Sequence, residues 1–372
     1  MRIAQVAPLI ESVPPKLYGG TERIVSWLTE ELVRQGHQVT LFASGDSLTS
    51  AQLVPAVPEA LRLQGIRDHI ASTLVMLDQV RKRAAEFDII HFHVDLLQFP
   101  IFQRIFSKCV TTLHGRLDLP DFQPIYRAFP KMPLISISEH QRLPMPRGVN
   151  WAGTIYHGLP PDLCPYSAAS DGYLVFLGRI APEKRPDRAI EIALRAGLPL
   201  KIAAKVDPTD EKYFAEVVEP MLKHPLVEFV GEVNDTAKAK LLGKAMAVLF
   251  PIDWPEPFGL VMIEAMSAGT PVVCWRAGSV PEIVEHGISG IIVDSIEDAV
   301  SAVEKVRNFS RARVREAFES RFTAERMASN YVAAYHSVLS GSRSSKSPGN
   351  RSMTPPREEQ LGGGPKGASA LD

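Results

Sequence analysis

The run PEPFGLVMIEAMSAGTPVV, residues 255–273, carries two carboxylates in unusual settings. Glu264 falls inside the apolar helical segment LVMIEAMSA, which should be buried, and a buried carboxylate is costly unless charge or hydrogen bonds compensate it. Glu256 lies between Pro255 and Pro257, and the proline that follows biases its backbone to an extended conformation that aims the side chain. One strand–helix junction is therefore expected to present both carboxylates.

The helix that carries Glu264 is predicted to begin just after Gly259. The first turn of a helix leaves backbone N–H groups free, and the positive end of the helix dipole would lie beside Glu256. The junction thus offers two acceptors for hydroxyl groups and an amide cradle for phosphate, a combination that suits a sugar nucleotide. For Glu264 alone, the alternative is a capped core helix with one buried carboxylate whose hydrogen bonds are satisfied.

Two cations, Arg179 and Lys184, follow the strand-like run YLVFLG. Beside a tight turn at Gly178 they suit a diphosphate, which they would hold by charge-assisted hydrogen bonds. The alternative is a solvated basic loop, because Arg185 and Arg188 continue the run of positive charge.

Glycines and histidines mark the ends of other strands. Gly19 and Gly20 follow the first strand, where glycine lets the backbone approach a ligand closely, although the three-glycine spacing of a dinucleotide fingerprint is missing. His114 ends the strand VTTLH and can bond a ligand or simply satisfy the strand end. His91 and His93 point to one face of their strand, as metal ligands or as strand-end caps.

The composition is that of an ordinary globular protein, with 372 residues, 45% hydrophobic and 22% charged. Lys and Arg number 41 against 42 Asp and Glu, so no global field recruits nucleic acid or an acidic membrane. The N-terminal run MRIAQVAPLI lacks a cleavage site for a signal peptide, and no apolar run approaches the roughly 18–20 residues of a membrane span. Three separated cysteines, Cys109, Cys164 and Cys274, predict neither a disulfide framework nor a zinc site, and we expect a reducing cytoplasm.

Strand-like apolar runs alternate with amphipathic helices along the chain. The first set is RIAQVAP, QVTLFA, DIIHF and VTTLH, with the helix TERIVSWLTEELVRQG and another near residues 68–86. The second set is YLVFLG, LPLKIAA, VEFVG, MAVLFP, TPVVC and GIIV. This alternation predicts an α/β fold with two doubly wound parallel sheets, and the loop PPDLCPYSAASDG, residues 160–172, is the expected linker between them.

We therefore expect domains over residues 1–165 and 171–322 and a C-terminal helix over residues 323–340 that is able to cross back to the first domain. Thr323 is the expected N-cap of that helix. Residues 341–372 are about half Gly, Ser and Pro with few bulky apolar groups, so we expect a disordered tail.

Six motifs occur in a characteristic order: YGGTERIVSWLTEELVRQGHQVTLF, TTLHG, YHGLPPD, GRIAPEKRPD, EPFGLVMIEAMSAGTPVV and GSVPEIVEHGISGIIV. With two doubly wound halves and paired glutamates, the chain resembles the retaining glycosyltransferases of family 4, within glycosyltransferase group 1. These enzymes have the GT-B fold, in which two Rossmann-like domains face each other across a cleft. The resemblance covers roughly residues 1–335, and the joint order of the motifs carries it.

The resemblance implies a role for each motif residue. Arg179 and Lys184 would stabilise the departing nucleoside diphosphate, which makes a divalent metal unnecessary. Glu264 would accept hydrogen bonds from the ribose, and Glu256 would face hydroxyls of the transferred sugar. Further donor contacts would come from Gly19 and Gly20, whose loop closes over diphosphate and acceptor, and from the amides of Phe258, Gly259 and Leu260.

Three more positions resemble the family pattern, and they differ in how closely they match it. The family has a histidine at the place of His114, near the transferred sugar. His157 occupies an interdomain turn that often carries Asn in the family, so we expect a hinge or structural role for it. Glu282, in GSVPEIV, matches the pattern and is also a favourable acid for a first helical turn, which is the interpretation we prefer.

The expected reaction is transfer of a hexose from a UDP- or GDP-sugar to an acceptor hydroxyl with retention of anomeric configuration and no cofactor or metal. The expected catalytic residues are Glu256, His114, Arg179 and Lys184. The alternatives are a nucleotide-sugar-binding protein without turnover and a GT-B sugar-nucleotide epimerase; a phosphorylase would need a pyridoxal lysine, for which we see no motif. The acceptor stays open between a glycan, a lipid-linked molecule and a small molecule, as expected for polysaccharide or glycolipid assembly. The mixed charge of the helix after Gly20 gives no support for membrane contact and does not exclude it.

Overall fold

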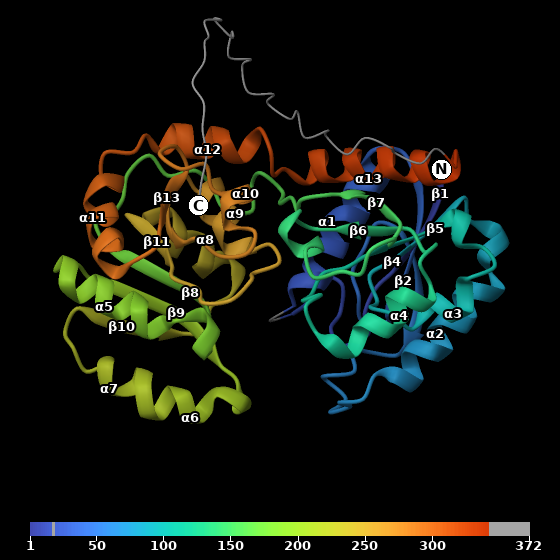
Figure 1. Cartoon of the computed structure of the whole chain (residues 1–372), viewed down its shortest axis with the longest axis horizontal. Coiled ribbons are helices and arrows are strands. Elements are labelled where there is room, and N and C mark those ends of the chain that lie inside the picture. Colours follow the sequence, from blue (N-terminus) through green and yellow to red (C-terminus); the bar gives the residue numbers. More distant parts are fainter. Residues whose placement is uncertain (17–18, 342–372) are drawn as a thin grey trace, which may run out of the picture.

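The structure is a computed structural model that describes residues 1–16 and 19–341. Two α/β halves lie side by side, and the C-terminal helix α13 (Ala324–Leu339) extends from the second half over the first (Figure 1). The tail predicted over residues 341–372 lies outside the described residues, apart from Gly341.

The first half contains a parallel sheet in the order β3-β2-β1-β4-β5-β6-β7. Its strands are β1 (Arg2–Val6), β2 (Gln38–Ser44), β3 (Gln52–Val57), β4 (Ile89–Phe92), β5 (Cys109–Thr112), β6 (Leu134–Ser136) and β7 (Trp151–Thr154). Its main helices are α1 (Gly20–Arg34), α2 (Ile70–Lys82), α3 (Gln98–Phe102) and α4 (Gln123–Ala128). Apolar residues of the sheet and of α2 and α3 form one core, which reaches from Val6 through Met76 to Phe102.

The second half contains a parallel sheet in the order β10-β9-β8-β11-β12-β13. Its strands are β8 (Leu174–Ile180), β9 (Leu200–Val206), β10 (Val227–Gly231), β11 (Ala247–Phe250), β12 (Val272–Trp275) and β13 (Gly290–Val293). Its helices are α5 (Pro186–Ala196), α6 (Glu211–Tyr213), α7 (Glu219–Met221), α8 (Asp235–Lys244), α9 (Leu260–Ser267), α10 (Val280–Ile283), α11 (Ile296–Val306) and α12 (Arg311–Glu319).

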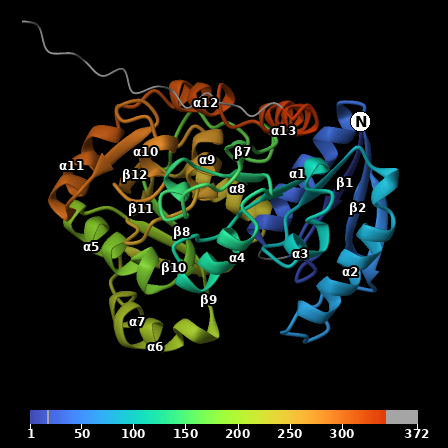
Figure 2. The same ribbon diagram turned by 45° about the vertical axis from the view of Figure 1, so that its right-hand side comes forward.

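The two sheets confirm the predicted α/β class with doubly wound parallel strands. In each sheet the strand order reverses beside the first strand of the half, β1 or β8, and ligands of such folds bind beyond the carboxyl ends of the strands at this point. Figure 2 shows the two halves from a second direction, with α9 and α1 on their facing sides.

The sequence analysis did not predict three strands of the first sheet. β3 contains Pro55 and is half exposed at the edge of the sheet, where proline is tolerated, so it lacks a continuous apolar run. β6 and β7 are only 3 and 4 residues long, too short for their periodicity to be recognised.

The chain passes between the halves twice at one place. Leu159 N donates to Phe322 O at 2.9 Å, and Ala324 N donates to Leu159 O at 2.8 Å, so the outgoing and returning segments lie side by side. Gly158 is required here because an added Cβ would lie 2.2 Å from Thr323 O. As predicted, Thr323 caps α13, its hydroxyl accepting from Arg326 N at 3.2 Å.

Helix α13 belongs to the core of the first half. Met327, Tyr331 and Tyr335 are buried there with Ile3 and Leu28, so the last helix covers the first sheet rather than the sheet it follows in sequence. No helix among residues 1–16 and 19–341 is long and apolar enough to cross a bilayer, and the cytoplasmic compartment stays a prediction.

Candidate active site

A cavity of about 480 Å³ opens between the two halves. Its lining comes from both halves and consists of Gly19, Gly20, Thr21, Arg23, His114, Ile137, His157, Leu177, Gly178, Arg179, Lys184, Ala203, Ala204, Lys205, Glu232, Val233, Asp235, Lys238, Phe250, Glu256, Pro257, Phe258, Gly259, Leu260, Val261 and Glu264. Every residue that the sequence proposed for catalysis or donor binding therefore lies around one space.

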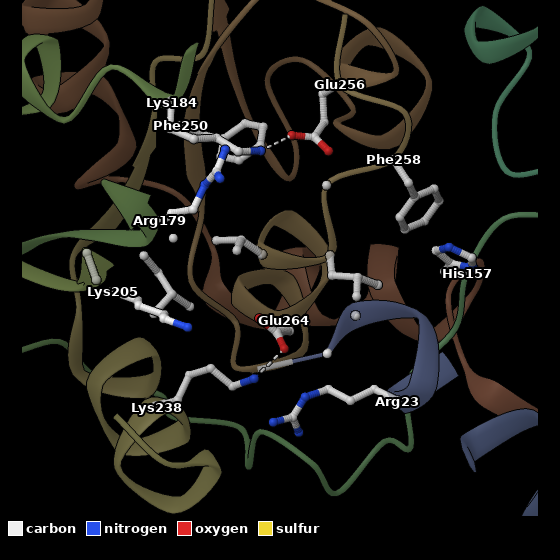
Figure 3. A pocket seen from close by; sticks show the side chains of 18 of the residues that line it. Arg23, His157, Arg179, Lys184, Lys205, Lys238, Phe250, Glu256, Phe258 and Glu264 are labelled. Atoms are coloured by element: carbon white, nitrogen blue, oxygen red, sulfur yellow. Dashed lines mark hydrogen bonds and ion pairs between the residues drawn. The ribbon is translucent and has the colours of Figure 1, made fainter. Parts of the chain in front are cut away.

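Glu256 and Lys184 form an ion pair on one side of this cavity (Figure 3). Lys184 Nζ lies 2.5 Å from Glu256 Oε2 and 4.4 Å from the centre of the Trp254 ring. The indole of Trp254 also donates to Glu256 Oε2, at 3.1 Å. Since the pair is mostly buried, with the two side chains 21% and 11% exposed, its geometry is held by the protein rather than by solvent.

The backbone of Glu256 is held by Gly278, in the loop between β12 and α10. A Cβ on Gly278 would lie 2.3 Å from Glu256 N and 2.4 Å from Glu256 O, and its φ of +55° is also one that glycine tolerates best. Next along the chain, Ser279 N donates to Glu256 O at 2.9 Å. The motif GSVPEIV thus fixes the position of a carboxylate that lies more than twenty residues earlier.

Arg179 lies on the cavity wall at the end of β8. Its guanidinium bonds Glu183 at 2.6 Å and approaches Asp210 at 3.5 Å. The two predicted phosphate-binding cations, Arg179 and Lys184, are therefore both paired with carboxylates, and these pairs offset the repulsion between two positive charges on the lining of one cavity.

Helix α9 begins beside Glu256, as predicted. Gly259 precedes it with φ of +82°, a left-handed conformation that explains why glycine stands here. Ser279 Oγ donates to Phe258 O at 2.8 Å, which orients the peptide just before the helix. Gly259, Leu260 and Val261, at the start of this helix, belong to the lining of the cavity, where the helix dipole favours anions.

Glu264 is buried on the opposite side of the cavity from Glu256 (Figure 3) and has the compensating charge that its position requires. Lys238 Nζ, from α8, bonds Glu264 Oε1 at 2.6 Å and Asp235 at 3.2 Å. Burial lowers the pKa of Lys238, but the charge of Glu264 and the hydrogen bond to it outweigh burial, and the pKa is raised overall. Asp235 pairs in turn with Arg23 of α1, so a chain of alternating charges joins the second half to the first.

The glycines after β1 form the edge of the cavity in the first half. Gly19 is closely packed, since an added Cβ would lie 2.9 Å from Pro15 and 3.0 Å from Glu22 Oε2. Gly20 begins α1, and a Cβ there would lie 3.8 Å from Leu260 of the second half. Burial of Glu22 beside this loop raises its pKa to about 7.

The histidines gather at the first-half end of the cavity. The rings of His114 and His157 stack at 5.3 Å, and Nδ1 of each is buried without a hydrogen-bond partner among the described residues. His114 Nε2 lies 2.9 Å from His93 Nδ1, and His91 bonds Tyr335 and Thr112 through its two nitrogens, each at 2.7 Å. The nitrogens of His91 and His93 that were considered as metal ligands are thus engaged in hydrogen bonds. Burial lowers the pKa of all four imidazoles, for His114 to about 3, so they are neutral near pH 7.

Glu282 makes specific contacts with the first half, in addition to its predicted place in the first turn of a helix. It does lie in the first turn of α10, but its carboxylate accepts from the amides of Glu139 and His140 in the first half, both at 2.7 Å. Tyr156 donates to the same carboxylate at 3.1 Å. Glu282 therefore ties the two halves together beside the cavity.

Sequence reasoning missed Lys238, Asp235, Arg23 and Gly278. Of these, only Lys238 had a signal in the sequence, because a buried carboxylate such as Glu264 requires a cation nearby. The sequence does not say which of the 41 Lys and Arg residues supplies that cation. Among the described residues no group of three or more His, Cys, Asp or Glu is arranged to hold a metal ion.

The chain is similar to known glycosyltransferases over most of its length. A family model described as glycosyl transferases group 1 matches residues 167–323, and one described as glycosyltransferase family 4 matches residues 18–143. An uncharacterised glycosyltransferase of Methanocaldococcus jannaschii is 25% identical over 335 residues, covering 78% of this chain and 85% of the relative. The phosphatidyl-myo-inositol mannosyltransferase of Mycolicibacterium smegmatis is 28% identical over 333 residues, covering 80% and 82%.

Solved structures show the same architecture. Anabaena HepE in complex with UDP-glucose superposes with a TM-score of 0.67 at 17% identity, covering 91% of this chain and 100% of HepE. The two family models together span most of the chain, in the order first half then second half. The chain therefore belongs to the group 1 glycosyltransferases and has the GT-B fold.

Proposed function

We propose that this enzyme transfers a hexosyl group from a nucleotide diphosphate sugar to an acceptor hydroxyl, with retention of anomeric configuration. The observation that carries the proposal is the placement of two differently paired glutamates on opposite sides of one cavity, with the N-terminus of α9 between them. A donor with its nucleoside at Glu264, its diphosphate at the N-terminus of α9 and its sugar at Glu256 would match these groups in order.

The donor would lie with its ribose hydroxyls at Glu264 and its hexose hydroxyls at Glu256. Arg179 and Lys184 would bond the diphosphate, each exchanging part of its contact with a neighbouring carboxylate for contact with phosphate oxygens. This exchange is favourable because phosphate accepts charge-assisted hydrogen bonds as carboxylate does and carries more negative charge. The first-turn amides of α9 would complete the phosphate contacts.

In the reaction, the bond between the anomeric carbon and the diphosphate oxygen breaks as the acceptor oxygen bonds the same carbon. The acceptor proton passes to the departing phosphate on the same face of the sugar, so no residue of the chain needs to act as a nucleophile. Negative charge grows on the phosphate, where Lys184, Arg179 and fixed amides would stabilise it, and such preorganised groups usually provide the largest contribution to catalysis. Because these cations supply the positive charge, we propose a reaction that needs no divalent metal.

The proposed donor is a UDP- or GDP-sugar. HepE, which has the same fold, binds UDP-glucose according to its structure, and this supports UDP as the first nucleotide to test. The acceptor is a hydroxyl compound, whether glycan, lipid-linked molecule or small molecule, and it would enter from the first half, opposite the donor.

A thermal-unfolding panel tests the proposal. The protein is heated with UDP, GDP and ADP and with their common hexose conjugates, each with and without EDTA. A ligand at about 100 times its dissociation constant adds about 2.7 kcal/mol to the folded state, which moves the midpoint by several degrees. We expect a shift with one base that EDTA does not change. No shift with any nucleotide would refute the donor, and a shift abolished by EDTA would refute metal independence.

A further inference from the structure

A continuous chain of hydrogen bonds runs from the cavity through the first sheet to the C-terminal helix. Its members, here called the polar relay, are His114, His93, Gln5, Tyr335, His91, Thr112 and Tyr331. They come from β1, from β4 and β5 with the residues just after these strands, and from α13, and apart from His114, which lines the cavity, all of them are buried. The function proposed above assigns a role to none of its members.

The part of the relay nearest the cavity is the decisive one. His114 Nε2 lies 2.9 Å from His93 Nδ1, and His93 Nε2 lies 2.7 Å from Gln5 Oε1. Gln5 Nε2 donates to the Tyr335 hydroxyl at 3.2 Å. Each ring nitrogen of His93 thus has one partner, and its role as donor or acceptor follows from the amide of Gln5.

An amide oxygen only accepts hydrogen bonds, and an amide nitrogen only donates them. His93 must therefore carry its proton on Nε2, facing Gln5 Oε1, which leaves Nδ1 as an acceptor. The partner of that acceptor, His114 Nε2, must then carry the proton of His114. Both imidazoles are neutral because burial lowers their pKa values, so the remaining nitrogen, His114 Nδ1, bears a lone pair.

The opposite orientation of the Gln5 amide would reverse every bond of the relay. His114 Nδ1 would then be a buried N–H group with no partner among the described residues, and such orphaned donors are rare in folded proteins. With Gln5 Oε1 facing His93, the spare hydrogen falls instead to a tyrosine hydroxyl at the far end, Tyr331, which can rotate to find an acceptor whereas an imidazole N–H cannot.

We propose that Gln5 and Tyr335 act as positioning residues that hold His114 in the Nε2–H tautomer, so that its Nδ1 accepts a hydrogen bond from a hydroxyl of the transferred sugar. This nitrogen is buried and has no hydrogen-bond partner among the described residues, and its side chain belongs to the cavity lining, so a sugar hydroxyl that reaches it would supply the missing bond. An acceptor at this point favours a sugar that presents a hydroxyl there and disfavours one that presents only an acceptor, such as the carboxylate of a hexuronic acid. The sugar preference rests on the proposed function, whereas the tautomer does not.

The relay also gives the crossing helix a role beyond packing. Tyr335 lies on α13, which follows the second half in sequence but covers the first sheet. Helix α13 therefore anchors the amide of Gln5, 330 positions before Tyr335, and through it the unpartnered Nδ1 of His114.

The test reads the tautomer directly by NMR of protein with ¹⁵N-labelled histidine side chains, without ligand, with the signals of His114 assigned from a His114→Gln variant. We expect a protonated Nε2 and an unprotonated Nδ1 in the wild-type protein. Gln5→Met, which keeps the side-chain volume but removes the amide, should give a mixture of tautomers. Thr112→Val, at the far side of Tyr335, is the matched control and should leave the signals of His114 unchanged. A wild-type Nδ1–H, or an unaltered spectrum in Gln5→Met, would overturn the proposal.

Two further variants keep the test valid if Gln5→Met folds poorly. Gln5→Glu retains an acceptor opposite His93 and should keep the wild-type tautomer of His114, whereas Tyr335→Phe removes the anchor of the amide and should not. Kinetics then tests the consequence, with the donor that the nucleotide panel identifies and its hexuronic acid counterpart. Loss of one hydrogen bond predicts that kcat/KM for the hexose falls about fivefold to tenfold in Tyr335→Phe, with weaker discrimination against the hexuronate.

The two proposals fail separately. If no nucleotide sugar is turned over, the tautomer measurement still stands because it needs no donor. If turnover is found but Tyr335→Phe leaves both the tautomer and the discrimination unchanged, the relay is refuted and the transferase is not.

Discussion

Replacing Lys238 by Met should destabilise the second half strongly, although Lys238 is not a residue that the sequence singled out. Its side chain is 12% exposed and that of Glu264 is 5% exposed, so the substitution would leave a buried carboxylate without its cation. Breaking a buried ion pair by removing one partner costs about 3–5 kcal/mol. For a domain of this size each kcal/mol lowers the unfolding midpoint by about 2–4 °C, so we expect a decrease of about 6–20 °C.

Differential scanning calorimetry measures this decrease, and Lys240→Met supplies the matched control. Lys240 is exposed on the same helix, α8, so its loss should change the midpoint little. The double variant Lys238→Met with Glu264→Gln should recover most of the lost stability, because a neutral amide no longer requires a buried counter-charge. A decrease of less than about 2 °C in Lys238→Met, or no recovery in the double variant, would refute the argument that this pair is what makes burial of Glu264 tolerable.

Three further predictions concern the cavity. Gly278→Ala should reduce turnover far more than Gly287→Ala. Both glycines have a positive φ, but only a Cβ at Gly278 would clash with the backbone of Glu256, so equal turnover in the two variants would contradict this packing argument. Lys184→Met should weaken binding of the nucleoside diphosphate much more than that of the nucleoside in calorimetric titrations, and an equal loss would remove Lys184 from the diphosphate site. Burial raises the pKa of Glu22 from 4.5 to about 7 in the folded protein, so the free-energy cost of ionising this carboxyl is absent below about pH 4.5 and fully present above pH 7. Glu22→Gln removes this cost, and the stability that it gains should be about 2–3 kcal/mol larger at pH 8 than at pH 5; a gain independent of pH would refute the shift.

The site residues that the sequence analysis identified are each marked by the residues next to them in the sequence. Glu264 interrupts an apolar helix, Glu256 lies between prolines, and Lys184 follows a strand end, so short-range chemistry alone marks each of them. Parallel strands bring such strand ends to one edge of a sheet, which is why residues far apart in the sequence could be assigned to one site.

What the sequence analysis missed depends on contacts between distant segments. Gly278 matters because of a backbone contact with Glu256, and Glu282 because its carboxylate reaches amides more than 140 positions earlier. The polar relay joins Gln5 to Tyr335 across almost the whole described chain. No local periodicity or composition encodes such contacts, since they arise only when two halves and a returning helix are assembled.

The measurement that tests the central claim most directly is ¹H NMR of the anomeric protons during slow hydrolysis of the donor, at high enzyme concentration and with water as the acceptor. UDP-glucose and GDP-mannose, both α-linked donors, are the probes, and Glu256→Gln is the comparison. Our account predicts that the α-hexose appears first, together with one equivalent of nucleoside diphosphate, and that release is about 100-fold slower in Glu256→Gln. First appearance of the β-hexose would contradict retention, and equal release by the two proteins would contradict the role of Glu256 in sugar transfer.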